Sequence, residues 1–399
     1  MVLPYLPYPL HSGGQTRSYN LIKHLSKKHQ ITLFSFIRQP KENQYVKNLS
    51  RYCVKIKTFP RGKAWTIKKI LLSALTPYSF LMANYYSLSL KKAIKEEIKE
   101  GKYDLVHVEC FYLMPNISRR VKVPKVLVDQ TIEYEVYRHF VQTLPWYLFP
   151  FKPFLYFDVL KIFLWEKHFW RKADFVSAVS ELDQKIIKKF CRRKKVGLTR
   201  NGVDFEKFKK RVYRRVRRPT ILFGVANFKW IQNKEAADIL LKRIWPKIKK
   251  KQKNCQLWVI GRHAPDLYQK YQDQEGVTIK EAKDVLPFYQ KAWLLLAPIG
   301  SGGGSRTKFF EAMAAGLPIV TTPAGIEGIK AKNGQEVLIG KTHRQLIRLT
   351  LKLIKDRRLS RRLAIKEKKL VSQEYSWQRS AEELEKIYQE ARKTMVNGQ

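Results

Sequence analysis

Short apolar segments alternate with amphipathic segments twice along the 399 residues, and this pattern constrains the fold more than any other feature. The first half holds apolar runs typical of buried strands at residues 31–37, 105–108, 126–128 and 175–179. The second half holds runs of the same kind at residues 220–224, 256–260, 294–298 and 318–321. Because helical patterns such as 19–25 and 90–99 separate the runs, the sequence predicts two doubly wound α/β domains with parallel sheets. A chain of this length also exceeds one ordinary hydrophobic core.

The chain is strongly basic, with 79 Lys and Arg against 33 Asp and Glu and a net charge of +46. Such a surface attracts polyanions, whether nucleic acid, anionic lipid or phosphorylated substrates. Basic residues gather at 192–195, 209–218 and 247–253, where they fit solvated helix faces equally well. Charge alone therefore selects no partner.

Four widely spaced cysteines form no C-x-x-C pair: Cys53, Cys110, Cys191 and Cys255. We therefore expect neither a zinc site nor a disulfide framework, and a reducing compartment is the better fit. The first residues are apolar but interrupted by Pro4, Pro7 and Pro9, so we expect no secretory signal.

Residues 298–318 read PIGSGGGSRTKFFEAMAAGLP and predict an anion-binding loop after a buried strand. Glycines let backbone N–H groups approach phosphate oxygens, and the N-terminus of the following helix adds partial positive charge. Arg306 and Lys308 supply full charges, while Glu311, one turn into the helix, can accept hydrogen bonds from sugar hydroxyls. The alternative is a glycine loop that only joins a strand to a core helix. The spacing of cations and acid favours the anion site.

A second glycine segment begins the chain, where residues 3–14 read LPYLPYPLHSGG before a helical pattern. Glycines again precede a helix N-terminus, so this loop could face the first one across a cleft between two domains. A simple turn fits the spacing equally well.

Two stretches rich in aromatics and lysines, residues 67–86 and 144–170, are candidates for contact with lipid. Neither offers 18 uninterrupted apolar residues, so a spanning helix is not expected. Aromatics mixed with lysines are typical of segments that lie in a membrane interface. The alternative is a packed helical subdomain with an aromatic core.

Five parts of the sequence, taken in order, match one pattern. They read PYPLHSGGQTRSYNLIKHL (7–25), DQTIEYEVYRHF (129–140), ADFVSAVSELD with RNGVDFEKF (173–183 and 200–208), SRTKFFEAMAAGLPIVTT (305–322) and YSWQRSAEELEKIY (375–388). Together they resemble the retaining GT-B glycosyltransferases called family four or group one. Each part alone is a weak signal, but their order over nearly the whole chain is specific.

The resemblance implies two Rossmann-like domains that face each other across a cleft, with the C-terminal helix returning to the N-terminal domain. It places an acceptor-side domain at 1–205, joined by the returning helix at 376–399, and a nucleotide-sugar-binding domain at 216–375.

The resemblance also implies roles for particular residues. It assigns donor binding to Gly13, Gly14, Gly302, Gly303, Gly304, Ser305 and Glu311, and Glu311 would bind the nucleotide ribose. Catalysis falls to three cations, Lys234, Arg306 and Lys308, although Lys229 competes with Lys234. A leaving nucleoside diphosphate needs positive charge where negative charge develops. Because cations and helix dipoles can supply that charge, we expect no metal and no other cofactor.

Three departures from the family pattern stand out. Gly303 occupies the position of a glutamate that usually touches the donor sugar, so the resemblance leaves the sugar open. Gln130 and Thr131 follow the strand where the family often has a histidine, and His107 is the nearest alternative. The family's first strand is almost absent, because only Met1 to Leu3 precede Pro4, which suggests a late start codon or a truncated strand.

We therefore expect a hexosyltransferase that moves a sugar from a nucleotide-sugar to an acceptor sugar or lipid-linked saccharide in envelope polysaccharide or glycolipid synthesis. The expected location is the cytoplasm, with peripheral attachment to the anionic inner face of the cytoplasmic membrane as an option. The alternatives are a basic nucleic-acid-binding protein and a degenerate transferase fold that only binds. We expect no specific nucleic acid, since the sequence shows no RNP-type, KH or helix-turn-helix signature.

Overall fold

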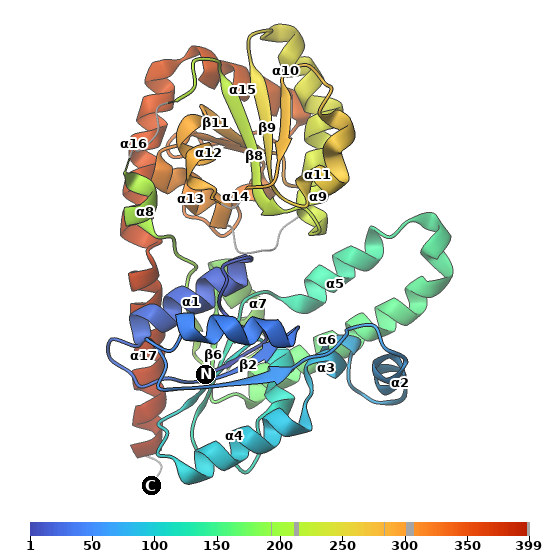
Figure 1. Cartoon of the computed structure of the whole chain (residues 1–399), viewed down its shortest axis with the longest axis vertical. Coiled ribbons are helices and arrows are strands. Elements are labelled where there is room, and N and C mark those ends of the chain that lie inside the picture. The colour runs from blue at the N-terminus through green and yellow to red at the C-terminus, as the bar shows by residue number, and fades with distance from the viewer. Residues whose placement is uncertain (193, 211–214, 283, 301–306, 397–399) are drawn as a thin grey trace. The chain divides into compact units, whose positions relative to one another are not determined.

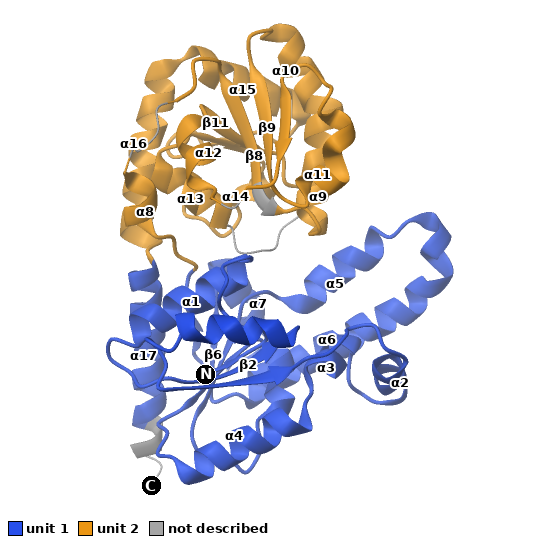
Figure 2. Ribbon diagram, viewed as in Figure 1, with its two compact units in different colours: residues 1–200, 303–305, 377–399 blue, residues 201–302, 306–376 orange. Residues whose placement is uncertain are grey.

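The computed structural model describes residues 1–192, 194–210, 215–282, 284–300 and 307–396. These residues form two compact units (Figure 2). Unit 1 contains Met1–Arg200 and the segment from Trp377 onward, and unit 2 contains the chain between them. The first boundary therefore lies at Arg200, a few residues before the expected position at 205. The reason is that Val203 and Phe208 are buried in the hydrophobic core of unit 2.

Unit 1 is built on a parallel seven-stranded sheet with the order β3-β2-β1-β4-β5-β6-β7. Its strands are β1 (Val2–Leu3), β2 (Thr32–Ile37), β3 (Lys55–Pro60), β4 (Val106–Glu109), β5 (Lys125–Asp129), β6 (Phe175–Ala178) and β7 (Val196–Leu198). The four strands expected from apolar runs are present as β2, β4, β5 and β6. The sequence did not predict β3 or β7, since β3 alternates lysines with apolar residues and β7 has only three residues.

The first strand is short but central. Val2 pairs with Phe34 on one side and with Val108 on the other. The amino group of Met1 donates to the carbonyl of Thr32 at 2.7 Å, so pairing begins with the first residue. Burial lowers the pKa of this amino group to about 6.

Unit 2 is built on a parallel six-stranded sheet with the order β10-β9-β8-β11-β12-β13. Its strands are β8 (Thr220–Asn227), β9 (Gln256–Arg262), β10 (Val277–Lys280), β11 (Leu294–Ala297), β12 (Ile319–Thr321) and β13 (Leu338–Ile339). The four apolar runs of the second half correspond to β8, β9, β11 and β12. Like the sheet of unit 1, this sheet is covered by helices, as the strand–helix alternation predicts (Figure 1).

The helices fill the connections between strands. In unit 1 they are α1 (Gly13–Leu25), η1 (Pro40–Asn48), α2 (Ile67–Leu75), α3 (Phe80–Tyr85), α4 (Leu88–Glu100), η2 (Phe111–Asn116), α5 (Glu133–Gln142), η3 (Trp146–Phe151), α6 (Lys152–Lys172), α7 (Glu181–Phe190) and α17 (Trp377–Val396). In unit 2 they are α8 (Phe205–Lys209), α9 (Ile231–Ile239), η4 (Leu240–Ile244), α10 (Trp245–Lys251), α11 (Ala264–Tyr268), η5 (Gln269–Tyr271), α12 (Leu286–Lys291), α13 (Thr307–Ala315), α14 (Pro323–Ile326), α15 (His343–Lys355) and α16 (Arg357–Glu374).

The closing helix α17 packs on unit 1, as expected for a returning C-terminal helix. Leu384 and Tyr388 of α17 share one buried cluster with Leu21 and Leu25 of α1. On an adjoining part of the same unit, the Arg200 side chain forms an ion pair with Glu383 of α17. Both apolar burial and paired charge therefore hold this helix on a unit that begins more than 370 residues earlier in the sequence.

Helices α5 and α6, joined through η3, form a hairpin that extends from the sheet of unit 1 (Figure 1). We call residues 133–172 the aromatic hairpin. The later part of α6 is anchored, because Ile162 and Trp170 are fully buried. Helix α2 is fastened beside it, since Lys161 Nζ donates to the carbonyls of Ser73 at 2.6 Å and Thr76 at 2.9 Å. Within the described chain, the helices include none that is long and apolar enough to cross a membrane.

Candidate functional site

The loop predicted to bind an anion follows β11, at the carboxyl edge of the unit 2 sheet, where ligands of doubly wound sheets bind. Its beginning is described, and Ile299 is buried against the core. Five predicted site residues lie outside the described residues: Gly302, Gly303, Gly304, Ser305 and Arg306. The described part of the site lies on β11 and α13, which flank this loop in the sequence, and on the elements in contact with them.

Lys308 lies in the first turn of α13 and is fixed from two sides. Its Nζ atom donates to Asn233 Oδ1 of α9 at 2.5 Å. The same ammonium group lies 5.5 Å from the ring centroid of Phe223 in β8. Asn233 is itself oriented, because its Nδ2 atom donates to the carbonyl of Asn227, the last residue of β8, at 3.0 Å. A charge-assisted hydrogen bond thus holds one predicted catalytic cation at the carboxyl end of β8.

Lys234 follows Asn233 directly in α9 and is exposed, as is the competing Lys229. The backbone around both is ordered by Asn227, whose Oδ1 atom accepts from the N–H of Lys229 at 2.9 Å. The structure thus brings the turn with Lys229 and the first turn of α9, which carries Lys234, next to Lys308.

The sequence reasoning missed Asn227 and Asn233, which organise this corner of the unit 2 sheet. Residues 227–236, NFKWIQNKEA, contain both asparagines, but the family resemblance implies a role only for the lysines of this segment. An asparagine at the end of an apolar run and another asparagine six residues later would have been the available signal, since asparagine side chains commonly bond to nearby backbone.

Glu311 lies in α13, three residues after Lys308, and keeps part of its surface open to solvent. Enclosure of its carboxyl group raises its pKa to about 7. The Tyr289 hydroxyl beside the carboxylate and the positive charge of Lys207 partly offset this rise. A partly desolvated carboxyl group whose pKa lies near neutral pH is typical of functional positions. Tyr289 was not among the residues predicted from the sequence.

The glycine pair of unit 1 begins α1, after Ser12, whose hydroxyl accepts from the N–H of Gln15 at 3.3 Å. A Cβ atom on Gly14 would lie 1.9 Å from the Tyr5 hydroxyl and 2.8 Å from Gln130 Oε1. Gly14 is thus required for close packing inside unit 1, whatever ligand approaches the helix. Gly13 is adjacent to it, at the first position of the helix.

A chain of half-buried and buried polar groups connects this turn to the centre of the unit 1 sheet. Tyr5 donates to Gln130 Oε1 at 3.0 Å, and Gln130 donates to Glu109 Oε2 at 2.6 Å. His107 lies 3.2 Å from Glu109 and 2.6 Å from the Tyr388 hydroxyl. Burial lowers the pKa of His107, so it stays neutral. His107, the alternative to the missing family histidine, is therefore enclosed between Glu109 and Tyr388 in the interior of unit 1.

Two sequence families match the chain. Residues 11–207 match the family described as Glycosyltransferase Family 4. Residues 218–356 match the family described as Glycosyl transferases group 1. A search of curated proteins found no match.

Solved structures share the fold over nearly the whole chain. Sucrose-phosphate synthase from Thermosynechococcus elongatus has a TM-score of 0.73 and 15% identity over 98% of both chains. HepE from Anabaena, solved in complex with UDP and glucose, has a TM-score of 0.65 and 13% identity over 97% of this chain and 98% of its own. WaaG, a glycosyltransferase involved in lipopolysaccharide biosynthesis, has a TM-score of 0.60 and 14% identity over 97% and 98%. The fold expected from the sequence is thereby confirmed.

Proposed function

Because this chain is a GT-B glycosyltransferase that uses a nucleotide-sugar, with a family 4 match in its first half and a group 1 match in its second, we propose that it transfers a hexose to a lipid-linked or envelope saccharide. One observation supports the position of the donor site most directly. Lys308 is held by Asn233 at the carboxyl edge of the unit 2 sheet, with Glu311 one turn further along the same helix. Retention of the anomeric configuration is proposed from the family resemblance.

The proposed mechanism uses fixed positive charge. The ammonium group of Lys308, together with Lys234 and Arg306, neutralises the diphosphate as the bond to the sugar breaks. Backbone N–H groups of residues 302–305 bind phosphate oxygens, and Glu311 accepts from the ribose hydroxyls. Gly13 and Gly14 let the acceptor or the donor phosphates approach the start of α1. A charge that is already oriented, as Lys308 is by Asn233, needs no reorganisation during the reaction.

We expect Glu311→Ala to weaken the binding of nucleoside diphosphate by about 1.5–3 kcal/mol, the range for a hydrogen bond to a charged group. The donor base is first identified by a thermal-shift screen of nucleotide-sugars, and affinity is then measured by calorimetry. Glu327→Ala, which removes a carboxylate elsewhere in unit 2, is the control. Unchanged nucleotide affinity in folded Glu311→Ala protein would remove Glu311 from the site.

The raised pKa of Glu311 gives this binding a pH dependence. The carboxyl is neutral below about pH 7 and ionised above it, and only the ionised form is a pure acceptor for two hydroxyls. Affinity should therefore rise between about pH 6 and pH 8 in the wild type beyond any rise in Glu311→Gln. The stability of the unliganded protein depends on pH in the opposite direction and falls as pH rises. The raised pKa of Glu311 contributes to the free energy of unfolding in full below the ordinary pKa of 4.5. This contribution is lost as pH rises through about 7.

We expect sugar transfer to survive chelation of divalent metal. The reason is that Lys308, Lys234 and Arg306 with the loop amides supply the charge that a metal would otherwise provide. The measurement is turnover in EDTA, compared with turnover after magnesium or manganese is added back. Activity that disappears in EDTA and returns with metal would contradict the metal-free mechanism.

We further propose that the acceptor is met at a membrane surface, and the aromatic hairpin supports this. Trp146, Phe149, Phe151 and Phe154 expose 84%, 67%, 59% and 76% of their surface. Cations accompany them, since Lys152 Nζ lies 5.2 Å from the ring centroid of Phe149. Large contiguous apolar patches are rare on monomeric proteins unless they bind something. Aromatics flanked by lysines suit the interface of an anionic bilayer.

Helix α2, which contacts α6, also exposes large apolar side chains. Ile67 and Leu75 of α2 are 78% and 81% exposed, and Trp65 before it is 76% exposed. The bonds from Lys161 to Ser73 and Thr76 fix the end of α2 on α6, so these exposed residues lie on an element attached to the aromatic hairpin. The alternative from the sequence, a packed aromatic core, applies to the later half of α6, where Phe169 and Trp170 are buried.

A further inference from the structure

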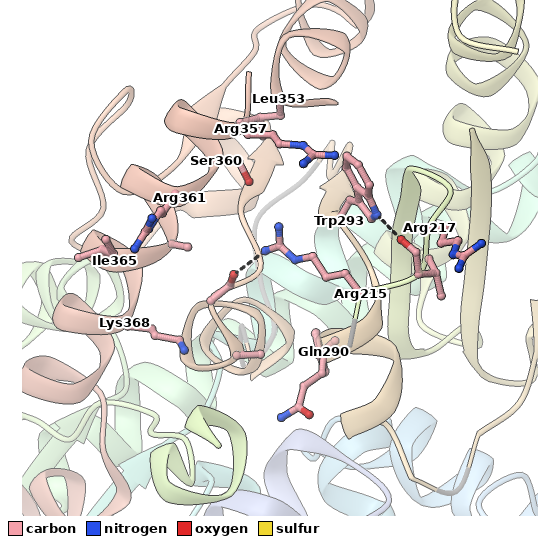
Figure 3. A pocket seen from close by; sticks show the side chains of 15 residues that line it. Arg215, Arg217, Gln290, Trp293, Leu353, Arg357, Ser360, Arg361, Ile365 and Lys368 are labelled. Atoms are coloured by element: carbon pink, nitrogen blue, oxygen red, sulfur yellow. Dashed lines mark hydrogen bonds between the residues drawn. The ribbon is translucent and has the colours of Figure 1, made fainter. Parts of the chain in front are cut away.

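Unit 2 contains a pocket of about 840 Å³ to which the proposed sugar-transfer mechanism assigns no role (Figure 3). It lies between the segment that precedes β8, the end of α12 with Trp293, the end of α13, and one side of α16. A cavity of this volume accommodates a ligand of nucleotide or sugar-phosphate size.

The charge of this pocket has one sign. Five of the lining side chains are cationic, Arg215, Arg217, Arg357, Arg361 and Lys368, and the described lining includes neither Asp nor Glu. We call these five residues with Trp293 the basic pocket. Burial raises the pKa of Glu367, which directly precedes Lys368 in α16, well above its ordinary value, and the charge of Arg215 acts against this rise. Even with that carboxylate counted, positive charge exceeds negative charge at the pocket.

The pattern of α16 explains how three of the cations come together. Arg357, Arg361 and Lys368 are spaced by four and seven residues, so they lie on the same side of the helix. Ser360 and Ile365 lie beside them on the pocket wall. The core-facing side of the helix carries Leu363 and Val371, which are fully buried.

Several of the groups are held in place before any ligand arrives. Arg215 donates to the carbonyl of Gly316 at 3.2 Å, and Figure 3 shows its side chain crossing the middle of the pocket. Trp293 is fixed by a hydrogen bond from Nε1 to the carbonyl of Val216 at 2.8 Å. The guanidinium of Arg357 lies 5.7 Å from the Trp293 ring centroid, so the indole positions this cation as well. Oriented arginines lose less freedom on binding, which favours recognition of a defined anion.

Most of this pocket lies at the other edge of the sheet from the proposed donor loop, and Tyr289, whose hydroxyl lies beside Glu311, is a lining residue that borders both. Trp293 directly precedes β11 and Gly316 lies shortly before β12, so both mark the amino edge of the sheet. The segment 215–217 likewise precedes β8. The donor loop and Lys308 lie at the carboxyl edge of the same sheet, beyond the opposite ends of these strands. The two groups of cations therefore lie at opposite edges of one sheet, separated by the length of its strands.

We propose that the basic pocket is a second anion site that binds a multiply phosphorylated group. Arginine forks match phosphate oxygens in pairs, and several in one pocket are suited to more than one phosphate. The same chemistry occurs in soluble polyphosphorylated metabolites and in phosphorylated lipid headgroups. Scattered surface arginines would not explain the site equally well, because here five cations line one cavity that also contains a fixed indole.

The test compares two double variants with equal loss of charge. Arg357→Gln/Arg361→Gln removes two pocket cations, whereas Arg358→Gln/Arg362→Gln removes two exposed arginines of the same helix that do not line the pocket. Calorimetry with inorganic tripolyphosphate should show a class of sites in the wild type and the control that weakens about tenfold or more in the pocket variant, equal to 1.4 kcal/mol or more. Turnover of nucleotide-sugar should stay the same in both variants.

A second arm identifies the source of the phosphate. Flotation with vesicles that contain phosphatidic acid, compared with neutral vesicles, should show a loss confined to the pocket variant if the ligand is a lipid headgroup. Loss of tripolyphosphate binding without loss of flotation identifies a soluble ligand, and either result supports the site. An equal loss in both double variants, or tripolyphosphate and vesicle binding unchanged in the pocket variant, would overturn the proposal. If Arg357→Gln/Arg361→Gln fails to fold, Arg217→Gln/Arg361→Gln, at two exposed positions, replaces it.

Discussion

Replacing Lys308 with methionine is expected to lower kcat/KM for sugar transfer by about 10²–10³-fold, as removal of one preorganised electrostatic group does in other enzymes. The loss should be mainly in kcat, because the charge on the leaving diphosphate is largest in the transition state. Methionine keeps the apolar stem over Phe223 but removes the ammonium group that Asn233 orients. Steady-state kinetics with the nucleotide-sugar found by thermal shift measures both constants.

The control for this variant is Lys332→Met, an exposed lysine in another loop of unit 2. It should leave kcat/KM unchanged. Asn233→Ala should change the rate in the same direction as Lys308→Met but less, since the charge remains and only its orientation is lost. Full activity in folded Lys308→Met protein would show that Lys234 or Arg306 neutralises the diphosphate without it.

Replacing Trp146, Phe149 and Phe151 together with serine is expected to weaken binding to anionic vesicles by about 100-fold or more. That change equals at least ~2.7 kcal/mol of binding free energy for three side chains. Full burial of a single large apolar side chain contributes about 1.5–3 kcal/mol, so partial burial of three is sufficient. Wild-type binding should be strong on anionic vesicles, negligible on zwitterionic ones, and weaker as salt rises, because charge brings the basic surface to the lipid. The residual binding of the triple variant should be the more salt-sensitive, since only its electrostatic part remains. Flotation or surface plasmon resonance measures these affinities.

Val54→Ser with Leu88→Ser provides the matched control, since both residues are exposed apolar positions of unit 1 outside the aromatic hairpin and α2. This control should bind vesicles like the wild type. The three aromatics are exposed, so their replacement should leave the thermal unfolding of the protein nearly unchanged. If the triple substitution leaves vesicle binding unaltered but converts an oligomer into a monomer, the surface binds a second copy of the chain and the membrane proposal is wrong.

The sheets were predictable wherever a strand is apolar and buried. The run ILFG at 221–224 and the run LLLA at 294–297 have no other plausible place than a core, and they form β8 and β11. Edge and short strands gave too little signal. Residues 55–60 read KIKTFP, and the lysines partly conceal the period of two, while β13 has only two residues. A short strand is fixed by the pairing of its neighbours rather than by its own composition.

The site was predictable in its charges but not in its geometry. Lys308 and Glu311 follow a glycine run at spacings that indicate phosphate and sugar chemistry, which is why both were singled out. Asn233 lies 75 residues away and joins the site only because β8 and β11 are neighbours in the sheet. The basic pocket has the same character, since Arg215, Trp293 and Arg357 are assembled from three distant segments.

The exposure of the aromatic hairpin could not be derived from its composition either. Helix α6 is apolar on two sides, with Ile162 and Phe169 on the buried side and Phe154 and Phe157 on the exposed side. A sequence with apolar residues all round a helix fits a core helix as well as an interfacial one. Only the position of α6 against η2, α5 and α7 decides which side is covered.

The place of α17 determines the order in which the protein completes its folding during translation. Unit 1 leaves the ribosome first, but the cluster around Leu21 and Leu25 closes only when Leu384 and Tyr388 arrive. All of unit 2 is synthesised in between and has its own core, so it can finish before the unit that preceded it. Nascent unit 1 therefore keeps an uncovered apolar face on α1 for the time needed to synthesise unit 2 and α17.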